Sequence, residues 1–212
     1  MRKIFLTTVV ALILSLQNFC GATATIDDAI FNGDENLKYP IVHTGNAVVD
    51  KKINHVIDGI MNNFVMGVRT DRRERGIDIH IMNTGYSVMC NGASGSEILS
   101  ILLTDYKYGR NGPAHPTTTT HTLNFNMTTG DLLDTSYLTA TRNISPADVS
   151  RKLEPYNADG DSPWKLSDGV LPLKSLPKGF YFDENLHLHF LFQRGEIAHF
   201  ARGVIDIDMD AL

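Results

Sequence analysis

The sequence predicts an α+β domain, an antiparallel β-sheet with one long and one short helix packed on it. Short segments that alternate apolar and polar residues are separated by turn residues, a pattern typical of antiparallel strands. One long segment, from about residue 47 to about residue 70, has the apolar spacing of an amphipathic helix. Strands and helices are segregated along the chain instead of alternating, which favours α+β over α/β.

The amino terminus has the layout of a secretory signal peptide. Arg2 and Lys3 precede an apolar run from Ile4 to Leu16, and Ala22-Thr23-Ala24 supplies a small-x-small cleavage site. The run is shorter than the roughly 20 residues that a membrane-spanning helix needs. We therefore expect residues 1–24 to be removed by cleavage near Ala24, and the protein to be secreted or periplasmic. An uncleaved anchor is the alternative, and no transmembrane segment is expected after cleavage.

The composition of the mature chain limits its partners. Removal of residues 1–24 leaves 188 of the 212 residues, enough for one core or two closely packed halves. The formal net charge of the full chain is −5, and loss of Arg2 and Lys3 makes it −7. This acidity argues against nucleic acid as a partner, and it suits a cationic protein.

Cysteine usage gives two expectations. Cys90 is the only cysteine of the mature sequence, so no intramolecular disulfide is expected, and we expect Cys90 to be buried in a strand. Cys20 is a candidate for lipid attachment, although Gln17-Asn18-Phe19 are not the small residues that normally precede such a cysteine. Whether Cys20 is lipidated stays open at this point.

Residues 25–95 are expected to form an amino-terminal half made of a strand, the long helix and a hairpin. The strand is predicted at Lys38–His43, with Pro40 placing it at a sheet edge or a strand start. The helix is predicted from about Ala47 to about Thr70, and Gly76 ends the region. Its apolar face comprises Val49, Ile53, Val56, Ile57, Ile60 and Phe64.

Two further features follow this helix. Arginines gather at its end, where cations complement the helix dipole; a patch for an acidic partner is the alternative. They are Arg69, Arg72, Arg73 and Arg75. Next, residues 77–82 alternate as a strand, Asn83-Thr84-Gly85 has turn chemistry, and residues 86–90 are expected to return as the hairpin partner. Residues 92–96 then link this hairpin to an apolar strand that ends near Tyr108.

Residues 96–212 are expected to form an α+β carboxy-terminal half that packs with the first as one module. A rigid corner at Gly112–Pro116 precedes a threonine-rich strand. A short helix is predicted where Ser145 supplies a cap and Pro146 takes the first helical position. A second hairpin is predicted from residues 180–182 and 186–192, followed by a closing strand near residues 204–207. Alternation in the threonine-rich strand places Thr118, Thr120 and Thr122 on one face, and Thr117, Thr119, His121, Leu123 and Phe125 on the other.

Several short motifs occur in a characteristic order. They are Tyr39-Pro40, Ile53-Asn54, Ile98–Ile101, Gly112–Pro116, Phe125–Gly130, Phe180–Phe182 and Glu196–Ala198. Together they resemble the extracytoplasmic domain of RsiV-type lysozyme-sensing anti-sigma factors, a module of the domain-of-unknown-function 3298 type preceded by a 4163-type half. The resemblance covers nearly all of the mature chain. It implies an α+β fold and ligand binding outside the cytoplasm, to lysozyme or to peptidoglycan. Pro113 departs from the family corner, which usually has a glycine there.

The first functional hypothesis is a secreted or periplasmic, non-catalytic binding module without a cofactor. Its candidate ligand-binding residues are Tyr108, His115 and Pro116 around the corner, together with Trp164, the only tryptophan. For His115 the structural alternative is a hydrogen bond to backbone that orders the corner, and for Trp164 it is core packing. No catalytic residue is assigned, because no nucleophile motif is evident in the sequence.

The second hypothesis is a metal-assisted hydrolase that acts on the cell envelope. His187 and His189 project from the same face of a strand, so both could reach one metal ion. His199, His115 or His121 would supply a third ligand. Glu196 or Asp183 would act as the general base. Paired surface histidines on a strand are the structural alternative, and the missing catalytic constellation favours the binding module.

Overall fold

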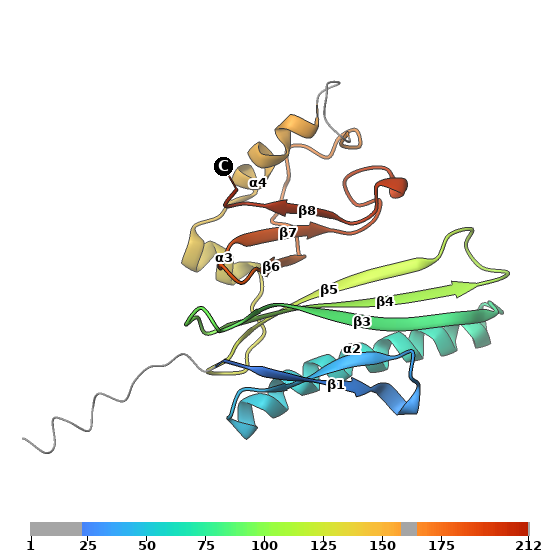
Figure 1. Ribbon diagram of the computed structural model, residues 1–212. Helices are drawn as coiled ribbons and strands as arrows, with labels where there is room; N and C mark the ends of the chain where they lie inside the picture. Colours follow the sequence, from blue (N-terminus) through green and yellow to red (C-terminus); the bar gives the residue numbers. More distant parts are fainter. Residues whose placement is uncertain (1–22, 158–164, 212) are drawn as a thin grey trace, which may run out of the picture.

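The computed structural model describes residues 23–157 and 165–211, and within them antiparallel sheets and helices confirm the α+β class. The molecule is layered (Figure 1). A central three-stranded sheet separates a lower layer, formed by the long helix and a two-stranded sheet, from an upper layer with a second three-stranded sheet and two short helices. The single sheet expected from the sequence is therefore three separate sheets.

Each layer is built from elements that are consecutive in the chain. The lower layer holds β1 (Thr25–Ile30), β2 (Lys38–His43) and α2 (Ala47–Glu74). The central sheet has the order β3-β4-β5, with β3 at Ile79–Asn91, β4 at Ile98–Gly109 and β5 at Thr117–Asn126. The upper layer holds α3 (Thr135–Arg142), α4 (Pro146–Leu153), β6 (Phe180–Phe182), β7 (Leu188–Phe192) and β8 (Ile205–Asp208).

The long helix begins where the sequence predicts and ends one turn later. Asn46 is its N-cap, and the side chain accepts hydrogen bonds from the backbone N–H groups of Val48 and Val49. At the other end, the buried Asp71 carboxylate lies 2.7 Å from the Lys107 ammonium of β4. This ion pair ties the last turns of α2 to the central sheet.

The hairpin predicted at residues 77–90 is wrong. The structure has one continuous strand, β3, in which Gly85 pairs with Thr104 of β4. A two-residue hairpin turn requires a positive φ, and Gly85 does not have one. Asn83-Thr84-Gly85 therefore stays extended because a full-length partner strand supplies its hydrogen bonds, and the true turn lies at residues 92–96, where Gly92 and Gly95 have positive φ.

Among the strands and α-helices of the described residues, β1 and α3 were not predicted. β1 pairs with β2 along its whole length, but most of its residues are exposed, so its sequence lacks a clear apolar alternation. α3 follows an Asp134 cap and buries only Leu138, which leaves no amphipathic stripe to detect. The upper layer therefore has two short helices instead of one. The predicted short helix is confirmed as α4, with a capping box between Ser145 and Asp148 and Pro146 in the first turn.

Two apolar cores lie on opposite sides of the central sheet. The lower core joins α2 and the β1–β2 sheet to residues such as Leu99, Ile101 and Phe125. The upper core joins the second sheet and both short helices to Cys90 and Ile98. β3 and β4 pair along most of their length, so residues 25–95 and residues 96–212 share the central sheet. Cys90 is buried, as expected.

Candidate functional site

The corner of residues 110–116 forms the tip of the β4–β5 hairpin, which extends beyond the upper layer (Figure 1). Its base is fastened to the end of α2. Asn111 Nδ2 donates to the Gly76 carbonyl at 2.7 Å, and Asn111 Oδ1 accepts from the Asp78 backbone N–H at 2.6 Å. The Arg110 N–H donates to the Asp78 carbonyl at 3.2 Å. The tip is therefore exposed but held in place.

A second contact braces the tip from the upper layer. The ring of His115 stacks on Phe200, with centroids 5.4 Å apart, although Phe200 is 42% exposed. The Arg194 guanidinium lies 5.6 Å from the centroid of the same Phe200 ring. With His199 and Ala201, these residues line a hollow of about 590 Å³. A cation, two imidazoles and an aromatic ring thus meet at one surface site.

The structure brings only some of the predicted ligand-binding residues around the corner to this hollow. His115 lines the hollow, but it makes no hydrogen bond to backbone within the described residues, so the ring stack replaces the expected bond. Tyr108 is half-buried and packs edge-on against His80 at 5.3 Å. Tyr108 and Pro116 do not line this hollow. Trp164 lies outside the described residues.

Sequence reasoning missed Arg194 and Phe200. Both lie in the connection between β7 and β8, which has no apolar periodicity. The one available signal is the large apolar residue Phe200 inside a polar connection, because an exposed aromatic side chain is often part of a binding surface. The sequence does not indicate that this connection meets the β4–β5 tip.

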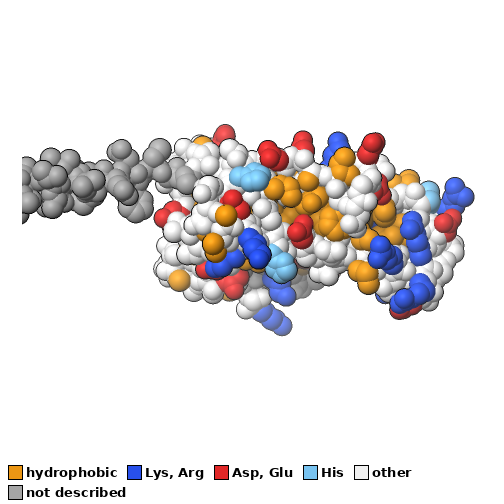
Figure 2. All heavy atoms as spheres, turned by 90° about the horizontal axis from the view of Figure 1, so that it is seen from below, with side chains coloured by type: hydrophobic (Ala, Val, Ile, Leu, Met, Phe, Trp, Pro, Cys, Tyr) orange, Lys and Arg blue, Asp and Glu red, His pale blue; other side chains and the backbone are white. Residues whose placement is uncertain are grey.

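The arginines at the end of α2 have mainly local partners. Arg72 donates twice to the Ile79 carbonyl, at 3.2 and 2.6 Å. Arg75 pairs with Asp71 at 3.2 Å, and Arg73 pairs with Glu74 at 2.6 Å. Figure 2 shows blue Lys and Arg side chains gathered at the right-hand end of the lower face, where α2 ends in Figure 1. The hairpin tip therefore lies at a basic end of an acidic protein.

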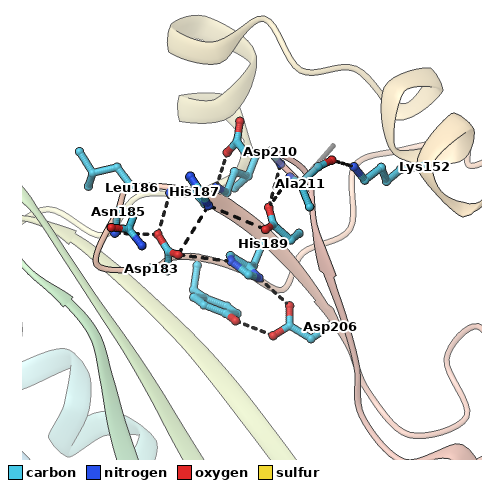
Figure 3. A network of polar contacts seen from close by, with 12 residues as sticks. Lys152, Asp183, Asn185, Leu186, His187, His189, Asp206, Asp210 and Ala211 are labelled. Carbon is cyan, nitrogen blue, oxygen red and sulfur yellow. Dashed lines mark hydrogen bonds and ion pairs between the residues drawn. The ribbon is translucent and has the colours of Figure 1, made fainter.

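The histidine pair lies in a different place, among aspartates of the second sheet (Figure 3). His189 Nδ1 lies 3.0 Å from Asp206 Oδ1, and its ring stacks on Tyr181 with centroids 4.6 Å apart. His187 Nδ1 lies 3.8 Å from both Asp183 Oδ2 and Asp208 Oδ2. The pair thus projects from one face, as expected, but its nearest polar neighbours are carboxylates.

The expected third ligand is not nearby. His199 follows β7 whereas His187 precedes it, and a five-residue strand spans roughly 17 Å. Among residues 23–157 and 165–211, no group of three or more His, Cys, Asp and Glu side chains is placed to hold a metal ion. His189 Nε2 is buried without a hydrogen-bond partner in the described structure, and Asp183 Oδ2 is 3.9 Å away.

Proton affinities in this cluster follow from its burial and charge. Burial, and then the hydrogen bond to Asp206, raises the pKa of the Tyr181 hydroxyl far above its ordinary value. Partial burial acts to raise the pKa of Asp208, but the backbone N–H groups of Asp210 and Ala211 and the nearby histidines lower it overall. Tyr181 therefore stays protonated and donates to Asp206, which in turn orients His189.

The two candidate general bases have structural partners. Asp183 Oδ1 accepts the backbone N–H groups of Asn185 and His187, at 2.9 and 2.8 Å, and so closes the β6–β7 turn. Glu196 Oε2 accepts the Gln193 N–H at 2.7 Å in the next turn. These contacts assign turn-forming roles to both carboxylates.

Comparison with protein families finds no match, and no curated protein sequence matches either. Among solved structures, a crystal structure of a DUF3298 family member from Bacteroides fragilis is similar, with a TM-score of 0.43 and 14% sequence identity. The similarity covers 87% of this chain and 87% of that one. It assigns no ligand, substrate or catalytic residue. In the part of the chain that the structure describes, no helix has the length and apolarity needed to cross a membrane.

Proposed function

We propose that the protein is a non-catalytic binding module that acts in the periplasm or outside the cell, and that the β4–β5 tip is its main contact surface. The observation that carries the proposal is the double bracing of an exposed loop. Asn111 fastens the tip to the end of α2, and His115 stacks on Phe200 of the upper layer. A loop that is already held in one shape loses little conformational entropy on binding, which favours affinity.

The charge distribution suits a cationic glycosidase such as lysozyme as the partner. The mature sequence has a net charge of −7, which attracts a cationic protein over long range. The tip itself carries Arg110 and His115 and lies beside Arg194. Glycosidase clefts hold a pair of carboxylates, so a basic tip complements the negative charge of the cleft. The acidic body of this protein complements the cationic surface around the cleft. The resemblance to lysozyme-sensing domains points to the same partner.

The test is calorimetric titration of residues 25–212 with a c-type lysozyme at low and at moderate salt. We expect saturable binding at both salts, and inhibition of lysozyme by the bound tip. His115→Ala and Phe200→Ala should each weaken binding by about tenfold, the loss typical of a contact worth more than 1 kcal/mol. His55→Ala, on the exposed side of α2, is the matched control and should bind like the wild type.

Two results would contradict this proposal. Binding that disappears at moderate salt would reveal charge attraction without a specific interface. Saturable binding that His115→Ala and Phe200→Ala leave unchanged would place the interface away from the tip.

A further inference from the structure

A second hollow lies between α2 and the β4–β5 hairpin, apart from the tip. Its volume is about 380 Å³, within the range of small-ligand pockets, which starts near 300 Å³. Ile60 and Phe64 of α2 form an apolar wall, and side chains of β4 and β5 form a polar wall. Such a combination of one apolar face and several hydrogen-bonding groups is typical of small-molecule sites.

The charged groups of the polar wall are already paired. His121 Nε2 donates to Asp105 Oδ2 at 2.8 Å, and the Asp105 side chain is only 11% exposed. Lys107 Nζ donates to the buried Asp71 carboxylate at 2.7 Å. His121 and Lys107 thus each have a carboxylate beside them, so the hollow has little net charge to offer a ligand.

Several neutral hydrogen-bonding groups in the same hollow have no partner among the described residues. The Asn63 amide and the Thr117 and Thr119 hydroxyls line the hollow, and none of them makes a hydrogen bond to a described residue. His121 Nδ1 likewise has no partner in the described structure, because only Nε2 is engaged. These groups include both donors and acceptors.

A helix glycine keeps the hollow open. Gly67 lies in the interior of α2, where glycine destabilises a helix relative to alanine. A Cβ atom at this position would meet nothing within 4 Å. Packing therefore does not require glycine there, and a side chain at residue 67 would extend from the wall of the hollow.

We propose that this hollow binds an uncharged sugar in its pyranose form. A pyranose has an apolar face of ring C–H groups, which fits Ile60 and Phe64. Its hydroxyl edge fits Asn63, the threonine hydroxyls and the His121–Asp105 pair, which together offer donors and acceptors. A charged sugar fits less well, because Asp105 is paired with His121 and Lys107 with Asp71, so that no unpaired charge in the hollow is left to bind it.

The test uses glucose and N-acetylglucosamine as probes, with glucuronate as the charged comparison, in saturation-transfer NMR titrations of residues 25–212. For a single ring we expect a dissociation constant on the order of 1 mM. Gly67→Leu should weaken binding by about tenfold or more, because its side chain occupies the hollow. Gly59→Leu is the matched control, since Gly59 lies in the same helix with equally free space but does not line the hollow.

Circular dichroism first establishes that both variants are folded, and Asn63→Ala provides a milder second variant. Neutral sugars that bind the wild type and Gly59→Leu but not Gly67→Leu would support the site. No binding at tens of millimolar, equal binding to Gly67→Leu, or glucuronate binding as tightly as glucose would each overturn it. Lysozyme titration of Gly67→Leu keeps this question separate from the proposed function, because the tip is unchanged in that variant.

Discussion

Tyr86 shows how a single contact fixes β3 to the amino-terminal strand. Its hydroxyl donates to the Asp28 carboxylate. Partial burial, followed by this hydrogen bond and the charges of Asp28 and Asp27, raises the pKa of Tyr86 to about 12. An unperturbed tyrosine has a pKa of about 10. Neutral Tyr86 therefore stabilises the fold fully below about pH 10, and this stabilisation is lost as the pH rises from about 10 to about 12.

We predict that Tyr86→Phe flattens the alkaline decline in stability, because the variant has no hydroxyl to ionise at this position. The urea midpoint measured from neutral pH to pH 12 should fall less steeply between pH 10 and 12 than in the wild type. Asp28→Asn should lower the pKa of Tyr86, as followed by tyrosinate absorbance. An unchanged alkaline slope in Tyr86→Phe would show that this contact does not couple folding to pH.

The candidate site shows which single site residues can be identified from the sequence. His115 is identifiable because it stands in a rigid Gly/Pro corner between two strands. Its partner Phe200 is not, because the contact depends on how the β7–β8 connection folds over the hairpin, and no local pattern encodes that. The alternation of β5 is more informative. It places His121 with Thr117 and Thr119, and all three line the hollow beneath α2, as a period of two requires.

At the scale of the elements, the glycines of α2 have free space around them, whereas the glycine just before β6 is closely packed. Gly59 and Gly67 lie in the helix with free space where an added methyl group would sit, whereas a Cβ at Gly179 would overlap the Leu191 carbonyl. We predict that Gly59→Ala and Gly67→Ala each stabilise the protein by about 0.5–1 kcal/mol. Gly179→Ala should destabilise it by about 1–3 kcal/mol, because backbone cannot move aside cheaply.

Urea unfolding followed by circular dichroism measures all three glycine variants. A destabilised Gly67→Ala would mean that the helix surface at this hollow is more closely packed than its open surroundings indicate. A neutral Gly179→Ala would mean that the connection before β6 shifts easily.

The elements also show which sequence patterns predict the structure correctly and which do not. α2 is predictable because its apolar stripe and its cap are local, and α4 because Ser145 and Pro146 mark its start. β3 does not turn at Asn83-Thr84-Gly85, although these residues favour a turn. Pairing with β4 outweighs that local preference. β1 and α3 are held by neighbours distant in sequence and bury few side chains, so neither has a periodic pattern.

At the scale of the whole molecule, a buried polar network joins the central sheet to the second sheet. Ser100 Oγ donates to Asn124 Oδ1 at 2.7 Å, and Asn124 Nδ2 donates to the Phe180 carbonyl at 2.7 Å. The Phe182 N–H in turn donates to Ser100 Oγ at 3.1 Å. Next to it, Gln193 pairs with both backbone groups of Thr120. The two Gln193 bonds occupy backbone groups of Thr120 on the outer edge of β5, which would otherwise be open to pairing with another chain.

Asn124 is the centre of that network, because its amide bridges the two sheets. We predict that Asn124→Ala lowers the free energy of unfolding by about 2–4 kcal/mol, since the buried Phe180 carbonyl loses its donor and a cavity remains. Asn124→Leu fills most of the space but restores no hydrogen bond, so it should also be destabilising. Asn62→Ala, on the exposed side of α2, is the control and should change stability by less than about 0.5 kcal/mol. Urea unfolding gives each value, and hydrogen exchange of the β6 and β7 amides shows whether the upper layer loosens first. A fully stable Asn124→Leu would mean that apolar packing alone holds the layers together, and that the polar network only fixes their register.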